Sequence, residues 1–479
     1  MAQIHKSSVR DELDRLKSNF EILSNQKKVS PETSMLINSM FVLMELICAI
    51  FLEKKTKKSD KNSSIPPSQN EKDDSALTDS KTGTKGKGKK EDDRLASNCK
   101  TTETVSIATV DTCNVCGNDL EGVEPCRHER RTSIDIIFEK VVTHVDAEIK
   151  ICPSCESTTK GIFPSNMHGK LQYGDGLKAF AINLVVCQMV ALGRAQKLIK
   201  SMIGQAISET TLLNFIMRLH LSLAPWEEQV INVLENSHVM NVDETGLRVD
   251  KKNHWIHVYC AGDITLKRLH RKRGKEAIEF IDIVPKYGGI IIHDCWASYF
   301  SYENCGHGLC GAHLLRELTF IVNANDYRWA ANIKKLLIET SKKVSKRKRK
   351  KLSQKEYANL QKRYRNIMTR GENELPEIPP KPNGQRGRMA KSAAHNLWER
   401  LSRHEDAVLL FAKNSHVPFT NNRAERDLRM AKVKQKVSGC FRNVEYAHAY
   451  CRISSYIQTM SSRGYNPLIA IQMALAGDI

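Results

Sequence analysis

The sequence lacks the features of a membrane or secreted protein. Its most apolar stretch, residues 35–52, is as long as the shortest membrane spans, yet it contains Asn38, Ser39 and Glu45. It has no N-terminal signal peptide, so disulfide bonds are not expected among its 14 cysteines. We therefore expect a protein of the reducing cytoplasm.

Acidic residues are scarce relative to basic ones. The 479 residues include 54 Asp and Glu but 74 Lys and Arg, which gives a formal net charge of +20 and a pI near 9.3. Cationic side chains that neutralise phosphates release counterions, so the imbalance favours a polyanionic partner, with nucleic acid as the leading candidate. Charge alone is weak evidence, because ribosomal and membrane-surface proteins share it. The length and the 41% hydrophobic content suffice for two or three domains.

Residues 1–53 have the pattern of helices. Apolar side chains recur at alternating steps of four and three positions, which is the spacing of a heptad seam. They are Leu36, Met40, Leu43, Ile47 and Ile50. We predict a helical oligomerisation region or a helical hairpin here, with a plain packing helix or a membrane anchor as alternatives. Residues 54–109 are polar and lysine-rich without apolar periodicity, which predicts a disordered basic linker.

Two Cys-x-x-Cys pairs follow the linker, separated by a stretch rich in β-branched residues that we expect to form strands. Thiolates at this spacing form a tight knuckle, and two knuckles complete a tetrahedral four-sulfur zinc site. Residues 110–168 are therefore predicted to be a zinc-binding ribbon with the ligands Cys113, Cys116, Cys152 and Cys155. The pairs lie farther apart than in the commonest zinc ribbons, which leaves redox-active or unliganded cysteines as alternatives. Cys126 and His128 are substitute candidates.

Residues 169–235 are predicted to be helical. Apolar positions at helical spacing end at Gly204, and Ser208 is a favourable N-cap for a second helix over 209–223. A helix, a short turn and a capped helix, with Lys197 and Lys200 nearby, resemble a helix-turn-helix that contacts DNA. Plain helical bundles share this pattern.

In residues 236–440 the sequence pattern changes to that of short apolar strands with connecting helices. This order fits a ribonuclease H-like sheet, although other α/β folds share it. Strands are expected at 238–242, 255–261, 265–270, 289–293 and 307–311, and a helix at 275–284. Residues 323–413 are predicted to be a helical insertion. They contain the basic run 342–351, which is a solvated helix face in most proteins and a backbone contact in a nucleic-acid enzyme. Residues 441–479 are predicted to be a C-terminal helical region.

Three acids in this region have the pattern of metal ligands. Asp243 and Asp294 each follow a short apolar strand, and Glu425 lies in a basic, helix-like segment. Carboxylates on two strand ends and one helix suit a two-metal site for phosphodiester chemistry. Each acid taken singly is weak evidence, because acids at strand ends are common in loops and caps. Glu244 is expected to point to the opposite face of its strand.

Six motifs, taken in their order along the chain, carry a family resemblance. The most specific is Asn421-Asn-Arg-Ala-Glu-Arg426. The others are residues 62–68, the paired Cys-x-x-Cys ribbon, residues 242–245, residues 293–299 and residues 310–316. With these motifs the chain resembles DDE transposases of the insertion-sequence 66 family over nearly its whole length. One departure is Gly311, which stands where an aromatic residue is expected.

The resemblance implies a multidomain α/β protein with a ribonuclease H-like catalytic domain, in which Asp243, Asp294 and Glu425 hold Mg²⁺ or Mn²⁺. It implies a bacterial, cytoplasmic and nucleoid-associated transposase that binds the ends of its element and joins them to target DNA. We expect a homo-oligomer, with accessory proteins of the same element as further partners. The expected DNA contacts are Lys197, Lys200, Arg423, Arg426 and Arg429.

Two rival functions remain at this stage. A metal-dependent nuclease or junction resolvase on the same fold would cleave DNA without strand transfer. A non-catalytic zinc and helix-turn-helix regulator would explain the charge and the cysteines but leave the three acids unassigned.

Overall fold

The computed structural model describes residues 104–376 apart from 137, 166 and 168, residues 391–478, and parts of the first 44 residues. The described N-terminal positions are 15–20, 22–24, 30, 33–34, 36–41 and 44. No helix in this part of the chain is long and apolar enough to cross a membrane. The chain divides into two compact units, one with residues 1–82 and 288–422, the other with residues 83–287 and 423–479.

Five strands form a mixed sheet of order β5-β4-β3-β6-β7. β3 (Val239–Val249), β4 (Lys252–Ala261) and β5 (Ile264–His270) make an antiparallel meander, while β6 (Ile290–His293) and β7 (Gly306–Leu309) are parallel. Helix α7 (Lys275–Ile281) follows β5. The predicted mixed α/β class is confirmed, and all five predicted strands are present.

The prediction that the first strand ends just before Asp243 was wrong. β3 continues to Val249, so Asp243 lies within the strand and pairs with Val258 of β4. Asp250 and Lys251, with φ of 46° and 60°, then make the two-residue turn of a β3–β4 hairpin. The outer half of β3 also gains hydrogen bonds to Phe441, whose backbone N–H donates to Arg248 O over 2.9 Å. Neither feature has a glycine or a local pattern that predicts it.

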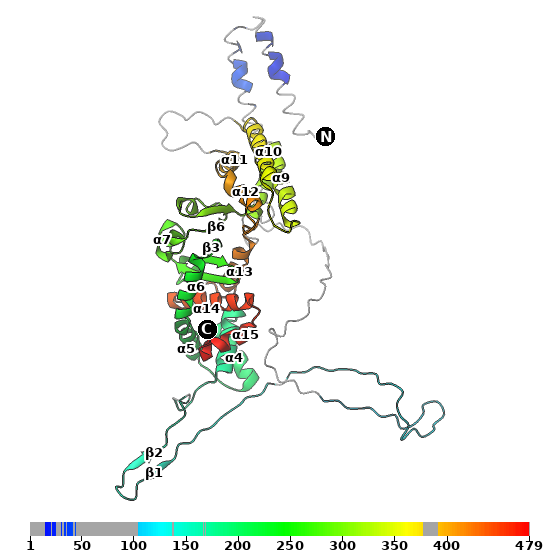
Figure 1. Ribbon diagram of the computed structural model, residues 1–479, viewed down its shortest axis with the longest axis vertical. Helices are drawn as coiled ribbons and strands as arrows, with labels where there is room; N and C mark the ends of the chain where they lie inside the picture. The colour runs from blue at the N-terminus through cyan, green and yellow to red at the C-terminus, as the bar shows by residue number, and fades with distance from the viewer. Residues whose placement is uncertain are drawn as a thin grey trace. The chain divides into compact units, whose positions relative to one another are not determined.

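In the described residues of the unit that contains residues 288–422, five α-helices follow β7 (Figure 1). They are α8 (Gly311–Asn325), α9 (Arg328–Ser345), α10 (Gln354–Glu372), α11 (Ala393–Arg403) and α12 (Glu405–Lys413). Their apolar faces share a core, in which Tyr364 Oη donates to Leu401 O over 3.0 Å and Trp398 Nε1 donates to Met368 O over 2.9 Å. These helices occupy the position of the predicted insertion.

In the other unit, the described residues form helices before and after the meander in sequence. They are α3 (Asp175–Ile182), α4 (Leu192–Ile203), α5 (Glu209–Ser222), α6 (Ala224–Glu235), α13 (Asn422–Ser438), α14 (Val444–Ser462) and α15 (Pro467–Ala476). α14 packs on β5, because the hydroxyls of Ser455 and Thr459 accept hydrogen bonds from the backbone N–H groups of Lys267 and Thr265. Such bonds satisfy backbone donors at the edge of the sheet.

The helix, turn and helix predicted around residue 204 are present. α4 ends at Gly204, whose φ of 68° is the left-handed conformation that glycine adopts without strain. Ser208 caps α5, with its side chain accepting from the backbone N–H of Thr211 over 3.0 Å. Lys197 and Lys200 lie on the exposed face of α4.

The described N-terminal residues include two helical segments whose side chains meet. The rings of Phe20 and Phe41 lie 5.9 Å apart, and Ser24 Oγ is 3.2 Å from Ser34 Oγ. Leu36 and Met40 of the predicted heptad seam are helical and exposed, whereas Leu43, Ile47 and Ile50 lie outside the described residues. Most of the predicted linker also lies outside them.

Candidate active site

Asp243 is held on β3 by local contacts. Its Oδ1 accepts a hydrogen bond of 2.8 Å from the backbone N–H of Glu244. Lys432 of α13 donates to Gly246 O over 2.9 Å, which places an ammonium group beside the same strand. Burial lowers the pKa of Lys432, an effect that the Asp243 carboxylate opposes. Sequence reasoning missed Lys432, because no pattern relates residue 432 to a strand so far back in the chain.

Asp294 directly follows β6, as predicted, and a histidine pair fixes the residue before it. His307 Nε2 is 3.0 Å from Tyr302 O and therefore carries the proton, so His307 Nδ1 accepts from His293 Nε2 over 3.2 Å. Burial holds the pKa of His293 well below its ordinary value, so both rings are neutral. His293 thus anchors the end of the strand.

Glu425 lies in the first turn of α13, and two neighbouring side chains fasten that helix to the meander. Asp427 is buried and accepts from Thr265 Oγ1 over 2.6 Å and from Cys260 Sγ over 3.4 Å. Arg423 donates to Gly262 O and, over 2.7 Å, to Ile264 O. Two of the N–H groups of Arg423 are therefore engaged within the protein. Arg426 and Arg429 are exposed.

Two groups of side chains in the described residues have neighbouring metal-ligand atoms, and each group spans at most 4.8 Å. One group consists of Asp243, Glu244 and Asp294, and the other of Cys310, His313 and Glu425. The structure therefore brings the two predicted aspartates together. Glu425 is grouped with a different pair of side chains.

Glu244 follows the alternation expected for its strand, because it pairs with His257 on the face opposite to that of Asp243. One of its carboxylate oxygens nevertheless lies within the same group as Asp243 and Asp294. Arg273 explains its placement: Nε and Nη2 donate to Glu244 Oε1 over 2.8 and 2.6 Å. The Glu244 side chain is 1% exposed, whereas that of Arg273 is 38% exposed, so the carboxylate is buried and the guanidinium reaches solvent. Arg273 lies over the Trp255 ring on this face, so the charge-assisted pair holds Glu244 on the side that strand alternation predicts.

Gly311 is explained by a neighbour that is distant in sequence. A Cβ atom at this position would lie 2.3 Å from the ring of Phe419, and Gly311 N donates to Phe419 O over 2.8 Å. Two residues further along, Asn421 N donates to Cys310 Sγ over 3.1 Å. Phe419 therefore fills the space at this position with an aromatic ring, and the junction orients the backbone that leads into α13.

The two Cys-x-x-Cys pairs form the same turn. Cys113 N donates to Asn118 O, and Gly117 N donates back to Cys113 O, each over 2.9 Å. Cys152 makes the corresponding two bonds, also of 2.9 Å, with Ser157 and Glu156. The four sulfur atoms are not among the groups of neighbouring ligand atoms in the described residues.

The strands that were predicted between the pairs are mostly absent from the described residues. Only β1 (Ile149–Ile151) lies in that stretch, and it pairs with β2 (Thr158–Lys160) after the second cysteine pair. β-Branched residues favour extended backbone but do not supply a partner strand. The second knuckle is therefore the turn of a β-hairpin.

A comparison with protein families matches residues 170–449, more than half of the chain, to the family described as the transposase IS66 family. This range contains Asp243, Asp294 and Glu425. A comparison with curated proteins gives no match. The resemblance predicted from the six motifs is confirmed: the chain belongs to the transposase IS66 family.

Proposed function

We propose that the protein binds the ends of its own insertion sequence and catalyses divalent-metal-dependent DNA cleavage and strand transfer. The observation that carries this proposal is the proximity of Asp243 and Asp294 within a region that matches a transposase family. A strand-transfer assay with end-containing DNA and Mg²⁺ tests it. Cleavage without joining would instead indicate the nuclease or resolvase, and end binding without either would indicate a regulator.

The sheet supports a ribonuclease H-like catalytic domain. Its order β5-β4-β3-β6-β7 combines a three-stranded meander with two parallel strands. In this arrangement Asp243 lies within β3 and Asp294 follows the end of β6. Helices α8 to α12 form an insertion between β7 and α13, which separates Glu425 from the aspartates in sequence.

Asp243 and Asp294 fit Mg²⁺ or Mn²⁺, because hard divalent cations take carboxylate oxygens. A cation there would neutralise charge on the phosphate and activate the attacking oxygen. Arg273 holds Glu244 in an ion pair, so we assign Glu244 to orienting the site. Glu425 is the third acid of the proposal, and Arg426 and Arg429 on its helix would position the DNA backbone.

Structural zinc is a separate proposal. The matching turns at Cys113–Cys116 and Cys152–Cys155 support this proposal, because the four thiolates of two such turns would close a tetrahedral site. We expect metal analysis of protein purified under reducing conditions to find about one zinc per chain. Changing either pair to serine should remove it. A full complement of zinc after both changes would place the metal elsewhere.

The tip of the α9–α10 hairpin is the proposed backbone contact from the helical insertion. Arg347 is tied to Glu356, but Lys346, Lys348, Arg349 and Lys351 are exposed and make no ion pair in the part of the chain that the structure describes. Leu352 N donates to Ala412 O over 2.8 Å, which holds the tip in place. Its cations therefore point into solvent from a fixed loop.

Changing Lys348 and Arg349 to Gln should weaken binding to all DNA sequences and reduce its salt dependence. Each lost phosphate contact lowers the slope of log affinity against log salt by about 0.9. Fluorescence anisotropy over a salt series measures the slope. The control is the double variant Lys362→Gln with Arg370→Gln. Both residues are exposed on α10, so this variant removes the same amount of charge at a distance from the tip. Equal slopes for the two double variants would mean that the tip is only a solvated surface.

A further inference from the structure

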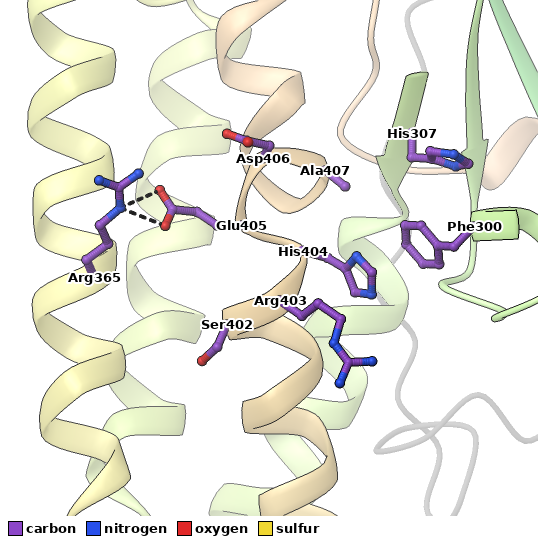
Figure 2. Close-up of a pocket in the computed structure, with 9 residues that line it drawn as sticks. All are labelled: Phe300, His307, Arg365, Ser402, Arg403, His404, Glu405, Asp406 and Ala407. Atoms are coloured by element: carbon purple, nitrogen blue, oxygen red, sulfur yellow. Dashed lines mark hydrogen bonds and ion pairs between the residues drawn. The ribbon is translucent and has the colours of Figure 1, made fainter. Parts of the chain in front are cut away.

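A cavity of about 440 Å³ lies in the unit that contains residues 288–422, and none of the three candidate acids lines it (Figure 2). It is lined by α10, by the junction between α11 and α12, and by residues near β7. Its volume falls within the range of cavities that hold small ligands. A cavity of this size accommodates one nucleotide.

Stacked rings form one wall of the cavity. The rings of His404 and Phe300 lie 3.9 Å apart with an interplanar angle of 14°. Phe300 also contacts His293, with ring centroids 4.8 Å apart. Because His293 precedes Asp294, a continuous series of ring contacts connects the cavity to the strand that carries this acid. A DNA strand bound at Asp294 therefore has an aromatic wall close to it.

Two charged residues of the cavity form an ion pair with each other, and two others do not. Arg365 Nε donates to both carboxylate oxygens of Glu405, over 2.8 and 3.1 Å, so these two charges neutralise each other (Figure 2). Arg403 and Asp406 make no side-chain hydrogen bond or ion pair within the described residues. The cavity thus offers the Arg403 guanidinium near the His404 ring and, on a different side, the Asp406 carboxylate (Figure 2). An apolar ligand would leave both charges without partners.

His404 contributes its ring without adding charge. Burial lowers the pKa of His404, and the positive charge of Arg403 lowers it further. The neutral imidazole, which is stacked on Phe300, presents a π surface on which any nucleobase can stack. Stacking of this kind tolerates all four bases, because every base has a π face.

We propose that the cavity binds one unpaired nucleotide of the DNA strand at the active site. The base stacks on the wall formed by His404 and Phe300, Arg403 binds the phosphate, and Asp406 accepts from an amino group of the base. A base within duplex DNA has both faces covered, so only a base outside the stack offers a face. The inference rests on the proposed function, which supplies the strand.

The test uses full-length protein in EDTA, where cleavage does not contribute. A single-stranded oligonucleotide with 2-aminopurine reports stacking by fluorescence quenching, and a duplex of the same sequence reports backbone binding. We expect His404→Ala to relieve the quenching and weaken single-strand binding roughly tenfold, while duplex binding changes less than twofold. Arg403→Ala should also weaken single-strand binding.

Matched variants separate binding from folding. His404→Phe keeps an aromatic face and should restore quenching, and Arg370→Ala, exposed on the same α10 as Arg365, should have no effect. Wild-type quenching in His404→Ala, with an unchanged unfolding temperature, would overturn the proposal. Free deoxynucleotide that competes as well as the oligonucleotide would identify a soluble nucleotide as the ligand and would also overturn it.

The same measurement on Asp294→Asn keeps the two proposals apart. Quenching should persist in this variant, because Asp294 does not line the cavity. Absence of strand transfer by wild-type protein that still quenches would refute the proposed function alone. Strand transfer without quenching would refute the cavity alone.

Discussion

Asp294→Asn should abolish DNA cleavage and joining while leaving end binding within about twofold. The change removes one charged oxygen from the carboxylate pair with Asp243 without altering side-chain size. Metal-assisted charge stabilisation contributes several kcal/mol at phosphorus, which corresponds to a loss of about a thousandfold or more. Asp243→Asn and Glu425→Gln should behave alike. Gel-based strand-transfer assays and mobility shifts with the same DNA measure the two effects separately.

Asp250→Asn is the matched control for these variants. Asp250 is exposed on the same β3–β4 hairpin, in a left-handed conformation that asparagine tolerates. It should keep wild-type cleavage and joining. If any one of the three acid variants also keeps them, that residue is not a catalytic ligand. Loss of end binding together with catalysis would point to misfolding instead.

Gly311→Ala should destabilise the unit that contains residues 288–422. The new Cβ would meet the Phe419 ring at 2.3 Å, so the ring must leave its position or the backbone must shift. Overpacking of this kind costs about 1–3 kcal/mol, and the shift would displace the segment that leads into α13. Urea unfolding should show the lost stability, and strand transfer should fall with it.

A double-mutant cycle isolates the cause. In the Phe419→Ala background the space at residue 311 is open. Adding Gly311→Ala should therefore lower the free energy of unfolding only slightly further. Gly288→Ala is the control for a lost glycine, because a Cβ there meets no atom within 4 Å. If Gly311→Ala is equally harmful with and without the Phe419 ring, the steric explanation fails.

The sequence by itself determined the elements and the family. Apolar runs located all five strands of the mixed sheet, and Gly204 and Ser208 located the turn between α4 and α5, because these signals act within a few residues. The ordered motifs identified the transposase family. Asp294 at the end of β6 also followed from a local pattern.

The tertiary structure decided how distant residues share space. β3 is longer than predicted because its outer half pairs with β4, and Phe441 adds hydrogen bonds at its end. Glu244 is held in an ion pair with Arg273. Gly311 is required because Phe419 occupies its neighbourhood. The contacts with Phe441, Arg273 and Phe419 join residues far apart in the chain, whereas periodicity and propensity report only on neighbours in sequence. Packing therefore set the site, and local pattern set the elements that carry it.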